Sequence, residues 1–375
     1  MSDAHLPSVD RELRRQLARG AALPGPLPLP DHEQLWTALG DAVEGGKRLR
    51  PALLLSAHAA LGGTRHEAAV QVGAALELLH TAFVVQDDVI DGDEVRRGVP
   101  SVPGGAAAQA ARHGATPAGA RRLGQAAGIL AGDLGLITAM RTISRCEAPA
   151  PVVEGLLDLF ETTLHATAAG ELADVRLQLA PAADPAPLRE VLAVAELKTA
   201  LYSFQLPLRA GALLAEAPSE VHSALDEIGS LLGIGFQLVD DLLGTFGDAQ
   251  RTGKSALGDL REGKRTALIA HASTTETWPA LQSLLGRADL DDHDASRARD
   301  LLTACGSRAW VEDLAHWHLT SASEAALRHG LPAALRDALE ATTAQILRGV
   351  ELTLPGPAHP SAGTAPPRAK EDQPA

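Results

Sequence analysis

A helical pattern of apolar side chains extends from residue 67 to residue 91 and ends in three closely spaced aspartates. Val70, Ala74 and Leu78 follow one another at four-residue intervals, which is the spacing of side chains on one face of an α-helix. A pattern of this length exceeds an ordinary β-strand. It therefore predicts a long, largely buried helix that carries acidic residues at its C-terminal end.

Similar helical patterns occupy most of the remaining chain, and clusters of Gly, Pro and Asp separate them. Alanine and leucine, which favour helices, dominate the composition, whereas the strand formers valine and isoleucine are comparatively sparse. No alternation of apolar and polar residues persists long enough to indicate a sheet. We therefore expect an all-α, single-domain helical bundle. The further predicted helices cover residues 51–61, 152–179, 186–215, 218–246, 256–272 and 310–329.

Segments rich in proline or glycine mark the limits of this bundle. Four prolines interrupt residues 20–30, so we expect a partly disordered N-terminal arm over residues 1–34. The Pro-, Ala- and charge-rich end predicts a disordered tail over residues 353–375, which leaves 35–352 as the folded domain. Residues 99–119 combine glycines with prolines, and we expect them to form a mobile loop.

The net charge and the cysteines restrict the classes of function. The chain carries a formal charge of −14 and lacks the basic surface that general nucleic-acid binding needs. No apolar run reaches the roughly 18 residues of a membrane-spanning helix, so no transmembrane segment is expected. Cys146 and Cys305 are far apart and in no metal-ligand spacing, which argues against a disulfide framework. Because Met1–Arg19 also lacks the apolar core of a signal peptide, a cytoplasmic protein is expected.

The long predicted helix ends in the run Asp87-Asp88-Val89-Ile90-Asp91. Asp87 and Asp91 are four residues apart and lie one turn apart on the same face, where like charges destabilise a helix unless they are neutralised. A hard cation such as Mg²⁺ neutralises them well, although a lone pair at this spacing could also be a solvated helix end. Arg96-Arg97 follow closely and suit a phosphate group, so the combination favours a Mg²⁺–diphosphate site.

A second apolar helical pattern ends in paired acids, Asp240-Asp241, and could likewise be a metal site or a solvated helix end. Basic residues occur at several points between and around the two clusters. A glycine-led basic turn before a predicted helix also suits a phosphate, although it lacks the P-loop spacing. Each of these residues alone would be an ordinary surface residue, and only the set indicates a site. The basic positions are Gly45-Gly46-Lys47-Arg48-Leu49-Arg50-Pro51, Lys198-Thr199, Lys254 and Lys264-Arg265.

At these residues the chain resembles the trans-polyprenyl diphosphate synthase family, of the short-chain type that includes farnesyl and geranylgeranyl diphosphate synthases. The motifs occur in the order and spacing of the family over residues 35–350, and their combination is specific although most are weak alone. They comprise the basic turn at 45–51, Glu77-Leu78-Leu79-His80, the acidic run at 87–91, Arg96-Arg97-Gly98, Ala131-Gly132-Asp133, Lys198-Thr199, Phe236-Gln237-Leu238-Val239-Asp240-Asp241 and Thr252-Gly253-Lys254.

The resemblance implies an isoprenoid synthase type I fold, with helices around a deep central cavity, and a homodimer. It implies head-to-tail (1′-4) condensation of isopentenyl diphosphate with an allylic diphosphate (dimethylallyl, geranyl or farnesyl diphosphate), assisted by three Mg²⁺ ions. The implied metal ligands are Asp87, Asp91 and Asp240, supported by Asp88 and Asp241. The implied contacts are Arg96, Lys198, Lys254 and Lys264 for the allylic diphosphate; Gly46, Lys47, Arg50, His80 and Arg97 for isopentenyl diphosphate; and Thr199 and Gln237 near the reacting carbons.

Two positions depart from the pattern of the family. The second acidic motif usually has a third aspartate, but Gly244 stands at that position here. Since this third acid is often the most distant from the metal, we expect activity to survive. The family's Gly-Gln-x-x-Asp motif is Gly170-Glu171-Leu172-Ala173-Asp174 in this chain, so a glutamate adds a negative charge where the family has a neutral amide.

Product length should depend on the depth of the cavity beneath the first acidic cluster. On a helix, the residues four, five and eight positions before Asp87 are Phe83, Ala82 and Leu79, and they point toward its interior. Phe83 is bulky and could equally be an ordinary core residue. We hypothesise that it sets a floor and gives a short-chain product, with geranylgeranyl diphosphate as the first expectation.

Two other functions compete with this interpretation. A class I terpene cyclase shares the fold and the metal cluster, but it has no need of the isopentenyl diphosphate pocket that Lys47, Arg50, His80 and Arg97 would form. A non-catalytic regulatory subunit of a prenyl synthase would be expected to lose its metal clusters. Here the first cluster is complete and the second lacks only the acid at Gly244, so the sequence favours condensation.

Overall fold

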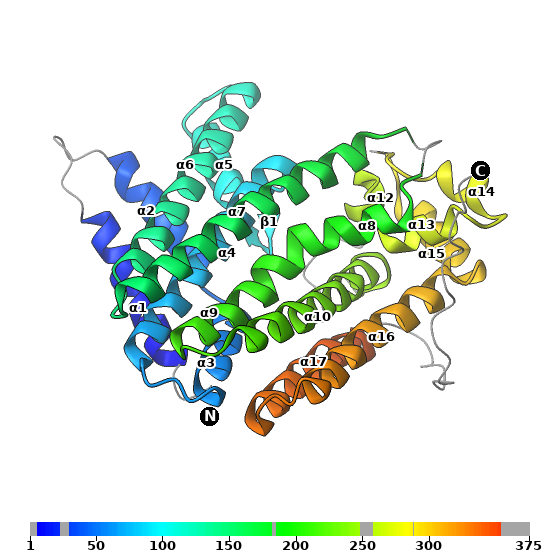
Figure 1. Ribbon diagram of the computed structural model, residues 1–375. Helices are drawn as coiled ribbons and strands as arrows, with labels where there is room; N and C mark the ends of the chain where they lie inside the picture. Colours follow the sequence, from blue (N-terminus) through cyan, green and yellow to red (C-terminus); the bar gives the residue numbers. More distant parts are fainter. Residues whose placement is uncertain (1–5, 23–29, 182–184, 248–257, 288, 354–375) are drawn as a thin grey trace, which may run out of the picture. The chain divides into compact units, whose positions relative to one another are not determined.

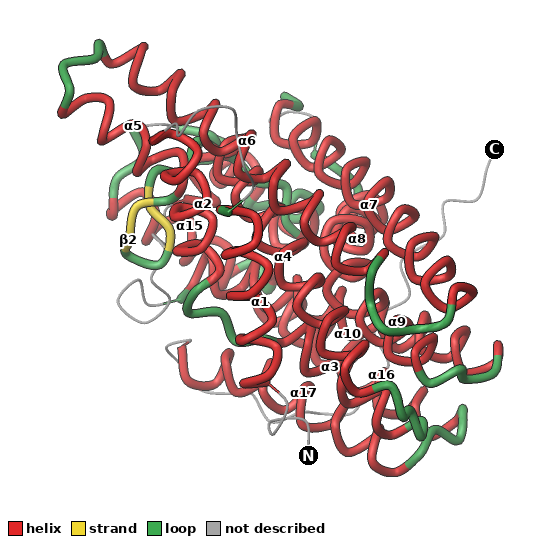
Figure 2. The backbone as a smooth tube through the Cα atoms, turned by 90° about the vertical axis from the view of Figure 1, so that its left-hand side faces the viewer, coloured by secondary structure: helices red, strands yellow, loops and turns green. Residues whose placement is uncertain are grey.

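The computed structural model describes residues 6–22, 30–181, 185–247, 258–287 and 289–353. Figures 1 and 2 show that these residues are almost entirely helical, which confirms the predicted all-α class. Within the described residues, the strands are β1 (Val95–Arg96) and β2 (Val99–Pro100), which pair as an antiparallel hairpin. The helices are α1 (Leu6–Ala21), α2 (Pro30–Val43), α3 (Leu49–Ala60), α4 (His66–Asp91), α5 (Val102–Arg112), α6 (Pro117–Ser144), α7 (Ala150–Leu179), α8 (Leu188–Ala195), the π-helix η2 (Glu196–Gln205), α9 (Leu206–Leu214), α10 (Ser219–Phe246), α12 (Gly258–Glu262), α13 (Ala267–Ala272), α14 (Trp278–Gln282), α15 (Asp292–Ala304), α16 (Ser307–Arg328) and α17 (Ala333–Thr353).

The chain divides into two compact units, and several helices contribute residues to both. The first unit comprises Met1–Thr167, Leu201–Gly229 and Ala326–Leu339. The second comprises Ala168–Ala200, Ser230–Ala325 and Glu340–Ala375. The first acidic cluster at Asp87–Asp91 therefore belongs to the first unit, and the second cluster at Asp240-Asp241 belongs to the second.

Helix α4 is the buried centre of the first unit. Its side chains form one apolar core with residues of α1, α6, α7 and α9, as predicted from its continuous apolar pattern. Helix α6 lies close against it because glycines face α4. A Cβ atom added to Gly132 would lie 2.6 Å from Cγ of Gln86, and one added to Gly128 would lie 2.3 Å from Cγ2 of Val89. Any larger residue at these glycines would push α6 away from α4.

The N-terminal segment contributes to this core. Val9 and Leu13 of α1 are buried within it, and Gly20 leaves room for the indole ring of Trp36 on α2. The proline-rich residues between these helices include 23–29, which lie outside the described part of the chain. The expected boundary between arm and domain at residue 34 stays a prediction, as does the expected tail, whose residues from 354 onward also lie outside.

Two expectations about local structure were wrong. Residues 99–119 do not form a loop, because α5 begins after Ser101, whose hydroxyl accepts a hydrogen bond from the backbone N–H of Gly104 at 3.0 Å. Pro103 stands in the first turn, where a helix loses no hydrogen bond to proline. The single helix predicted over 256–272 is instead α12 and α13, which Gly263 (φ 70°) separates with a left-handed turn.

The second unit is built around the C-terminal half of α10. Gly233 allows close packing against Ala200 of η2, because an added Cβ would lie 2.3 Å from the Cα of Ala200. Gly235 packs in the same way against Leu319 of α16. The π-helix η2 follows α8 directly and contains Lys198 and Thr199. Single π-helical turns inside α-helices often occur at functional sites, because they change the direction of the side chains that follow.

Two helices are long and apolar enough to cross a membrane by length and composition alone, although the sequence shows no uninterrupted apolar run of that length. In α4, 83% of the apolar window is buried inside the protein, as in the core helix of a soluble fold. In α6 the buried share is 39%. Helix α6 therefore leaves much of its apolar surface uncovered within the described chain.

Candidate active site

The first acidic cluster lies at the C-terminal end of α4, where the helix ends at Asp91. Gly92 ends the helix in the left-handed conformation (φ 74°), which glycine adopts without a Cβ clash. The backbone then enters the β1–β2 hairpin, in which Arg96 pairs with Val99. This sharp turn brings Arg96 back against the aspartates that precede it in the sequence.

Arg96 forms ion pairs with three carboxylates. Its Nε lies 2.5 Å from Oδ1 of Asp88, and its Nη2 lies 3.4 Å from Oδ2 of Asp87 and 3.4 Å from Oδ2 of Asp93. Asp88 is 2% exposed, and this burial raises its pKa to about 6, although the positive charge of Arg96 acts to lower it. Asp88 therefore holds Arg96 in place, while Asp87 and Asp91 are only partly buried, so that solvent reaches their side chains.

The positive charges of four arginines of the same unit act on His80: Arg48, Arg50, Arg96 and Arg97. Burial is the main reason why the pKa of His80 lies well below its ordinary value, and the positive charges of these arginines lower it further. The imidazole is therefore neutral at physiological pH. Its Nδ1 is buried and has no hydrogen-bond partner among the described residues. A concentration of positive charge beside a neutral imidazole favours an anionic ligand with several oxygen atoms.

Arg50 is held by two residues that follow Lys198-Thr199 in the sequence. Its Nη2 donates a hydrogen bond of 2.7 Å to Oγ of Ser203, and its guanidinium lies 4.7 Å from the centre of the Tyr202 ring. His80 stacks on the same ring, with 6.1 Å between centroids. The sequence did not indicate Tyr202 or Ser203 as site residues, although their positions four residues after Lys198 and Thr199 were a usable signal.

The basic turn before α3 is anchored by acidic residues. Nε of Arg48 lies 2.8 Å from Oδ1 of Asp10 in α1, and its Nη1 lies 3.7 Å from Oε2 of the buried Glu77. Gly46 lies close to the same guanidinium, since an added Cβ would be 2.9 Å from Nη1 of Arg48. Lys47 is exposed. The turn therefore offers the Lys47 ammonium to a ligand, while Arg48 fixes the backbone.

The proposed chain-length residues differ in their surroundings. Leu79 and Ala82 are fully buried, and Ala82 faces α6, where an added Cβ at Gly135 would lie 3.0 Å from its own Cβ. Phe83 is partly buried and packs edge-on against Tyr202, with 5.1 Å between ring centroids. Of the three, Phe83 is thus the one in direct contact with the aromatic ring that supports Arg50.

In the second unit, a chain of hydrogen bonds orients Gln237. Oγ1 of Thr199 donates to Oε1 of Gln237 at 2.6 Å, and Nε2 of Gln237 donates to Oδ1 of Asp241 at 2.8 Å. Burial raises the pKa of Asp241 well above its ordinary value, and the negative charges of Asp259, Asp240 and Asp174 raise it further. The hydrogen bond from Gln237 acts in the opposite direction and lowers this pKa. Asp240 is exposed, so its carboxylate is the accessible one of the pair.

Lys198 lies between two carboxylates of α7. Its Nζ is 3.0 Å from Oε2 of Glu171 and 2.8 Å from Oδ2 of Asp174. Gly170 permits this approach of α7 to η2, because an added Cβ would lie 2.7 Å from Cβ of Leu197. The unusual Glu171 therefore has a definite partner: it adds a second negative charge beside the lysine that the sequence assigned to the allylic diphosphate.

Lys264 also lies near two carboxylates, since its Nζ is 3.4 Å from Oδ1 of Asp259 and 3.2 Å from Oε2 of Glu262. Lys254, the other lysine assigned to the allylic diphosphate, lies in 248–257, outside the described residues. The sequence did not indicate Asp259 as a site residue. Its side chain lies near Lys264, which is close in sequence, and also near Gly244, which is fifteen positions earlier.

The chemistry of these residues fits Mg²⁺ better than a metal held wholly by protein. Among the described residues, no three side chains of the His, Cys, Asp and Glu types gather closely enough to hold a metal alone. Mg²⁺ characteristically takes one or two carboxylates and completes its shell with water and substrate phosphates. Carboxylates next to Arg96 in one unit, and next to Lys198 and Lys264 in the other, provide that combination of groups.

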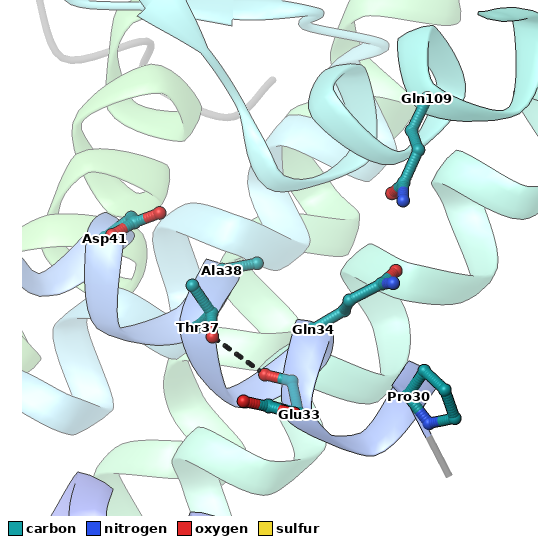
Figure 3. A pocket seen from close by; sticks show the side chains of 7 residues that line it. All are labelled: Pro30, Glu33, Gln34, Thr37, Ala38, Asp41 and Gln109. Carbon is teal, nitrogen blue, oxygen red and sulfur yellow. Dashed lines mark hydrogen bonds between the residues drawn. The ribbon is translucent and has the colours of Figure 1, made fainter.

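A surface hollow elsewhere in the first unit does not have this chemistry. It lies on α2 and near α5, and its acidic and amide side chains point around an open depression (Figure 3). Thr37 donates a hydrogen bond of 2.9 Å to the backbone oxygen of Glu33 at its edge. Without a basic side chain it does not suit a diphosphate. It is lined by Pro30, Glu33, Gln34, Thr37, Ala38, Asp41 and Gln109.

Taken together, the helical fold, the acidic helix ends and the adjacent cations define a class of enzymes that handle a diphosphate with the help of a divalent metal. The Polyprenyl synthetase family matches residues 32–302. A geranylgeranyl diphosphate synthase of Methanosarcina mazei is 31% identical over 317 residues, which are 84% of this chain and 90% of the relative. A (2E,6E)-farnesyl diphosphate synthase of Mycobacterium tuberculosis is 32% identical over 297 residues, 76% of this chain and 75% of the relative.

A solved structure shows the same fold. The geranylgeranyl pyrophosphate synthase of Corynebacterium glutamicum, complexed with isoprenyl diphosphate and magnesium, superposes with a TM-score of 0.79 at 26% identity, over 92% of this chain and 97% of that one. The chain therefore belongs to the polyprenyl synthetase family, and it is a prenyltransferase that makes prenyl diphosphates. This confirms the resemblance, the fold and the enzyme class inferred from the motifs.

Proposed function

We propose that the enzyme condenses isopentenyl diphosphate head-to-tail (1′-4) with an allylic diphosphate and releases geranylgeranyl diphosphate. The observation that carries the proposal is that Arg50 and His80 both lie on the ring of Tyr202, in the same unit as Arg96 and the acidic end of α4. This group is suited to a second diphosphate in addition to the one bound through the metal. A condensation needs two diphosphate sites, whereas a cyclase acts on a single diphosphate substrate.

The residues would divide the work as follows. Asp87 and Asp91, and separately Asp240, would hold Mg²⁺, three ions in all, which would neutralise charge on the departing diphosphate. In the first unit, Arg96, held by Asp88, would donate hydrogen bonds to a diphosphate; in the second, Lys198 is the cation that would do so. Cleavage of the allylic C–O bond leaves a carbocation, to which the double bond of isopentenyl diphosphate adds.

Proton loss completes the reaction. The proton lost from the added unit would pass to the departing diphosphate, so the proposal assigns no side-chain base. Thr199 and Gln237 are held by the hydrogen bonds between them and Asp241, and they would present fixed dipoles to the developing cation. Because these dipoles are already oriented, little reorganisation is needed when charge develops.

The test uses purified protein with MgCl₂, farnesyl diphosphate and ¹⁴C-labelled isopentenyl diphosphate. We expect labelled geranylgeranyl diphosphate on reversed-phase chromatography, and no product when EDTA removes the metal. Geranyl and dimethylallyl diphosphate are tried as primers in parallel. If the label enters no product with any of the three primers, the condensation proposal is wrong; diphosphate release from an allylic substrate alone, with a cyclic hydrocarbon, would identify a cyclase instead.

We also propose that the enzyme is a homodimer that pairs through α6. Leu123, Leu130 and Ile137 follow one another at seven-residue intervals and are exposed by 52%, 51% and 61%, so they form one apolar stripe along the helix. Ile129 and Met140 widen it. A second copy of α6 would cover this stripe, which accounts for the small buried share of its apolar residues. The predicted cytoplasmic location is compatible with this but rests on the sequence alone.

Replacing Leu130 and Ile137 together with lysine should convert the dimer to a monomer, because two charges in the centre of the stripe would be desolvated in the interface. Size-exclusion chromatography with light scattering measures the change as a halving of the mass. Leu327→Lys is the matched control, since Leu327 is equally exposed, at 64%, but lies on α16. A double variant with the mass of the wild-type protein would rule out α6 as the interface.

A further inference from the structure

The backbone of Arg48, in the basic turn before α3, has a left-handed conformation (φ 54°, ψ 33°). A residue with a Cβ atom rarely adopts this conformation, because the Cβ crowds a neighbouring carbonyl oxygen. Such a residue persists only when its surroundings hold it, and many examples occur at functional sites. The groups that hold Arg48 therefore also determine where Gly46 and Lys47 of the same turn lie.

Three helices hold the guanidinium of Arg48. Its Nε donates a hydrogen bond of 2.8 Å to Oδ1 of Asp10 in α1, and its Nη1 donates one of 2.9 Å to the backbone oxygen of Val43 at the end of α2. Glu77 of α4 also faces Nη1, but at 3.7 Å, which is too long for a hydrogen bond. Asp10 is therefore the carboxylate bonded directly to Arg48. Because the Arg48 side chain is only 11% exposed, salt screens this pair less than a surface ion pair.

Helix α1 is packed where Asp10 can reach the turn. Val9, immediately before Asp10, and Leu13, one turn later, are buried in the core of the first unit. A Cβ added to Gly73 of α4 would lie 3.6 Å from Cγ2 of Val9 and 3.4 Å from Cβ of Pro51. Helix α1 and the start of α3 thus pack against the same point of α4. This packing sets the distance between Asp10 and the basic turn.

Arg48 in turn limits the position of Gly46. A Cβ added to Gly46 would lie 2.9 Å from Nη1 of Arg48 and 3.9 Å from Oε2 of Glu77. The backbone of Gly46 therefore lies against the guanidinium that Asp10 holds, and the exposed Lys47 follows it directly. A displacement of Arg48 would move both residues that the sequence assigned to isopentenyl diphosphate in this turn.

We propose that Asp10 is a positioning residue for isopentenyl diphosphate, and that it acts through Arg48 to hold Gly46 and Lys47 in the arrangement that binds this substrate. The inference rests on the proposed function, which requires a site for isopentenyl diphosphate. Asp10 precedes residue 32, where the match to the family begins. The support therefore comes from the N-terminal helix of this chain, whereas the residues of the turn lie within the matched part.

The sign of the effect distinguishes positioning from simple electrostatics. Asp10 carries a negative charge close to the basic turn, so its charge alone would weaken the binding of a diphosphate there. Removing that charge with Asp10→Asn would then lower the KM for isopentenyl diphosphate. If Asp10 acts by holding Arg48, the same change should raise this KM, because Gly46 and Lys47 would lose their fixed positions.

The measurement is the steady-state elongation of farnesyl diphosphate with labelled isopentenyl diphosphate. We expect Asp10→Asn to raise the KM for isopentenyl diphosphate about tenfold, which corresponds to about 1.4 kcal/mol. The kcat and the KM for farnesyl diphosphate should stay within twofold of wild type. Asp10→Glu keeps the charge and should stay within threefold. Glu12→Gln is the matched control, because it removes the same charge from the same helix but from a residue that pairs with Arg15 at 2.6 Å. It should change each KM less than twofold.

Arg48→Gly tests whether Asp10 acts through Arg48. Glycine adopts the left-handed conformation without a Cβ clash, but it has no guanidinium for Asp10 to hold. Adding Asp10→Asn to Arg48→Gly should therefore change the KM for isopentenyl diphosphate less than twofold, compared with about tenfold when Arg48 is present. A general loss of folded enzyme would instead lower kcat and leave both KM values unchanged.

The outcomes separate this inference from the proposed function. If the wild-type protein elongates farnesyl diphosphate and Asp10→Asn lowers or does not change the KM for isopentenyl diphosphate, the inference is wrong and the proposed function stands. A tenfold effect that persists in the Arg48→Gly background would also overturn it, since Asp10 would then act independently of Arg48. A wild-type protein that elongates no allylic primer would overturn the proposed function and the inference together.

Discussion

Replacing Asp87 with asparagine should lower kcat by about 10²- to 10³-fold, which is the usual loss when one preorganised stabilising group is removed from a charged transition state. The amide keeps the shape of the side chain but binds a cation weakly. The Asp87 side chain is more exposed than that of Asp88, so a cation from solvent can reach its carboxylate. The rate of elongation is measured over a range of MgCl₂ concentrations, and we expect the variant to need more Mg²⁺ for its half-maximal rate.

Glu94→Gln provides the control for Asp87→Asn. Glu94 follows the same helix end within a few residues, is exposed, and loses the same charge. Because it makes no ion pair with Arg96, we expect its kcat to stay within twofold of the wild-type value. Comparable losses in the two variants would mean that the general negative potential matters and not the specific ligand, and an active Asp87→Asn enzyme would remove Asp87 from the metal site.

Features that depend on neighbouring residues in the sequence could be predicted. The continuous apolar pattern predicted α4 to within one residue of its observed start at His66 and its end at Asp91. The nearness of Arg96 to the acidic cluster was also foreseeable, because Gly92 and a short turn leave little chain between them. Periodicity and turn chemistry are local properties, so the sequence alone carries them.

Features that depend on contacts between distant segments could not be predicted. Helix α6 was missed because its glycines weaken the helical signal, and those glycines make sense only once Gln86 and Val89 of α4 are placed against them. The partner of Glu171 is Lys198, twenty-seven residues away, and the pairing requires α7 and η2 to lie side by side. In the same way, the close approach of the Asp259 side chain in α12 to Gly244 in α10 joins segments fifteen residues apart and is seen only in the folded chain.

Replacing Phe83 with alanine should lengthen the product by one or more isoprene units. Phe83 lies one turn before Asp87 on α4, and its ring packs edge-on against Tyr202, with 5.1 Å between centroids. Removing the ring leaves a space lined by apolar atoms, into which a growing apolar chain can extend because it stays out of water there. Leu79 is buried a further turn below, so the added depth should be limited. Mass spectrometry of the products formed from farnesyl diphosphate measures the shift.

Loss of a large side chain also loosens a core, so the effect on length must be separated from the effect on stability. Truncating a buried phenylalanine costs about 3–5 kcal/mol, and Phe83, being only partly buried, should cost less. Phe160→Ala is the matched control, because Phe160 belongs to the same core and is 4% exposed, but lies on α7. It should lower the melting temperature at least as much and leave the product unchanged. If both variants lengthen the product, the cause is the general loss of core packing. If Phe83→Ala leaves the product length unchanged, Phe83 is a packing residue and does not limit the depth of the cavity.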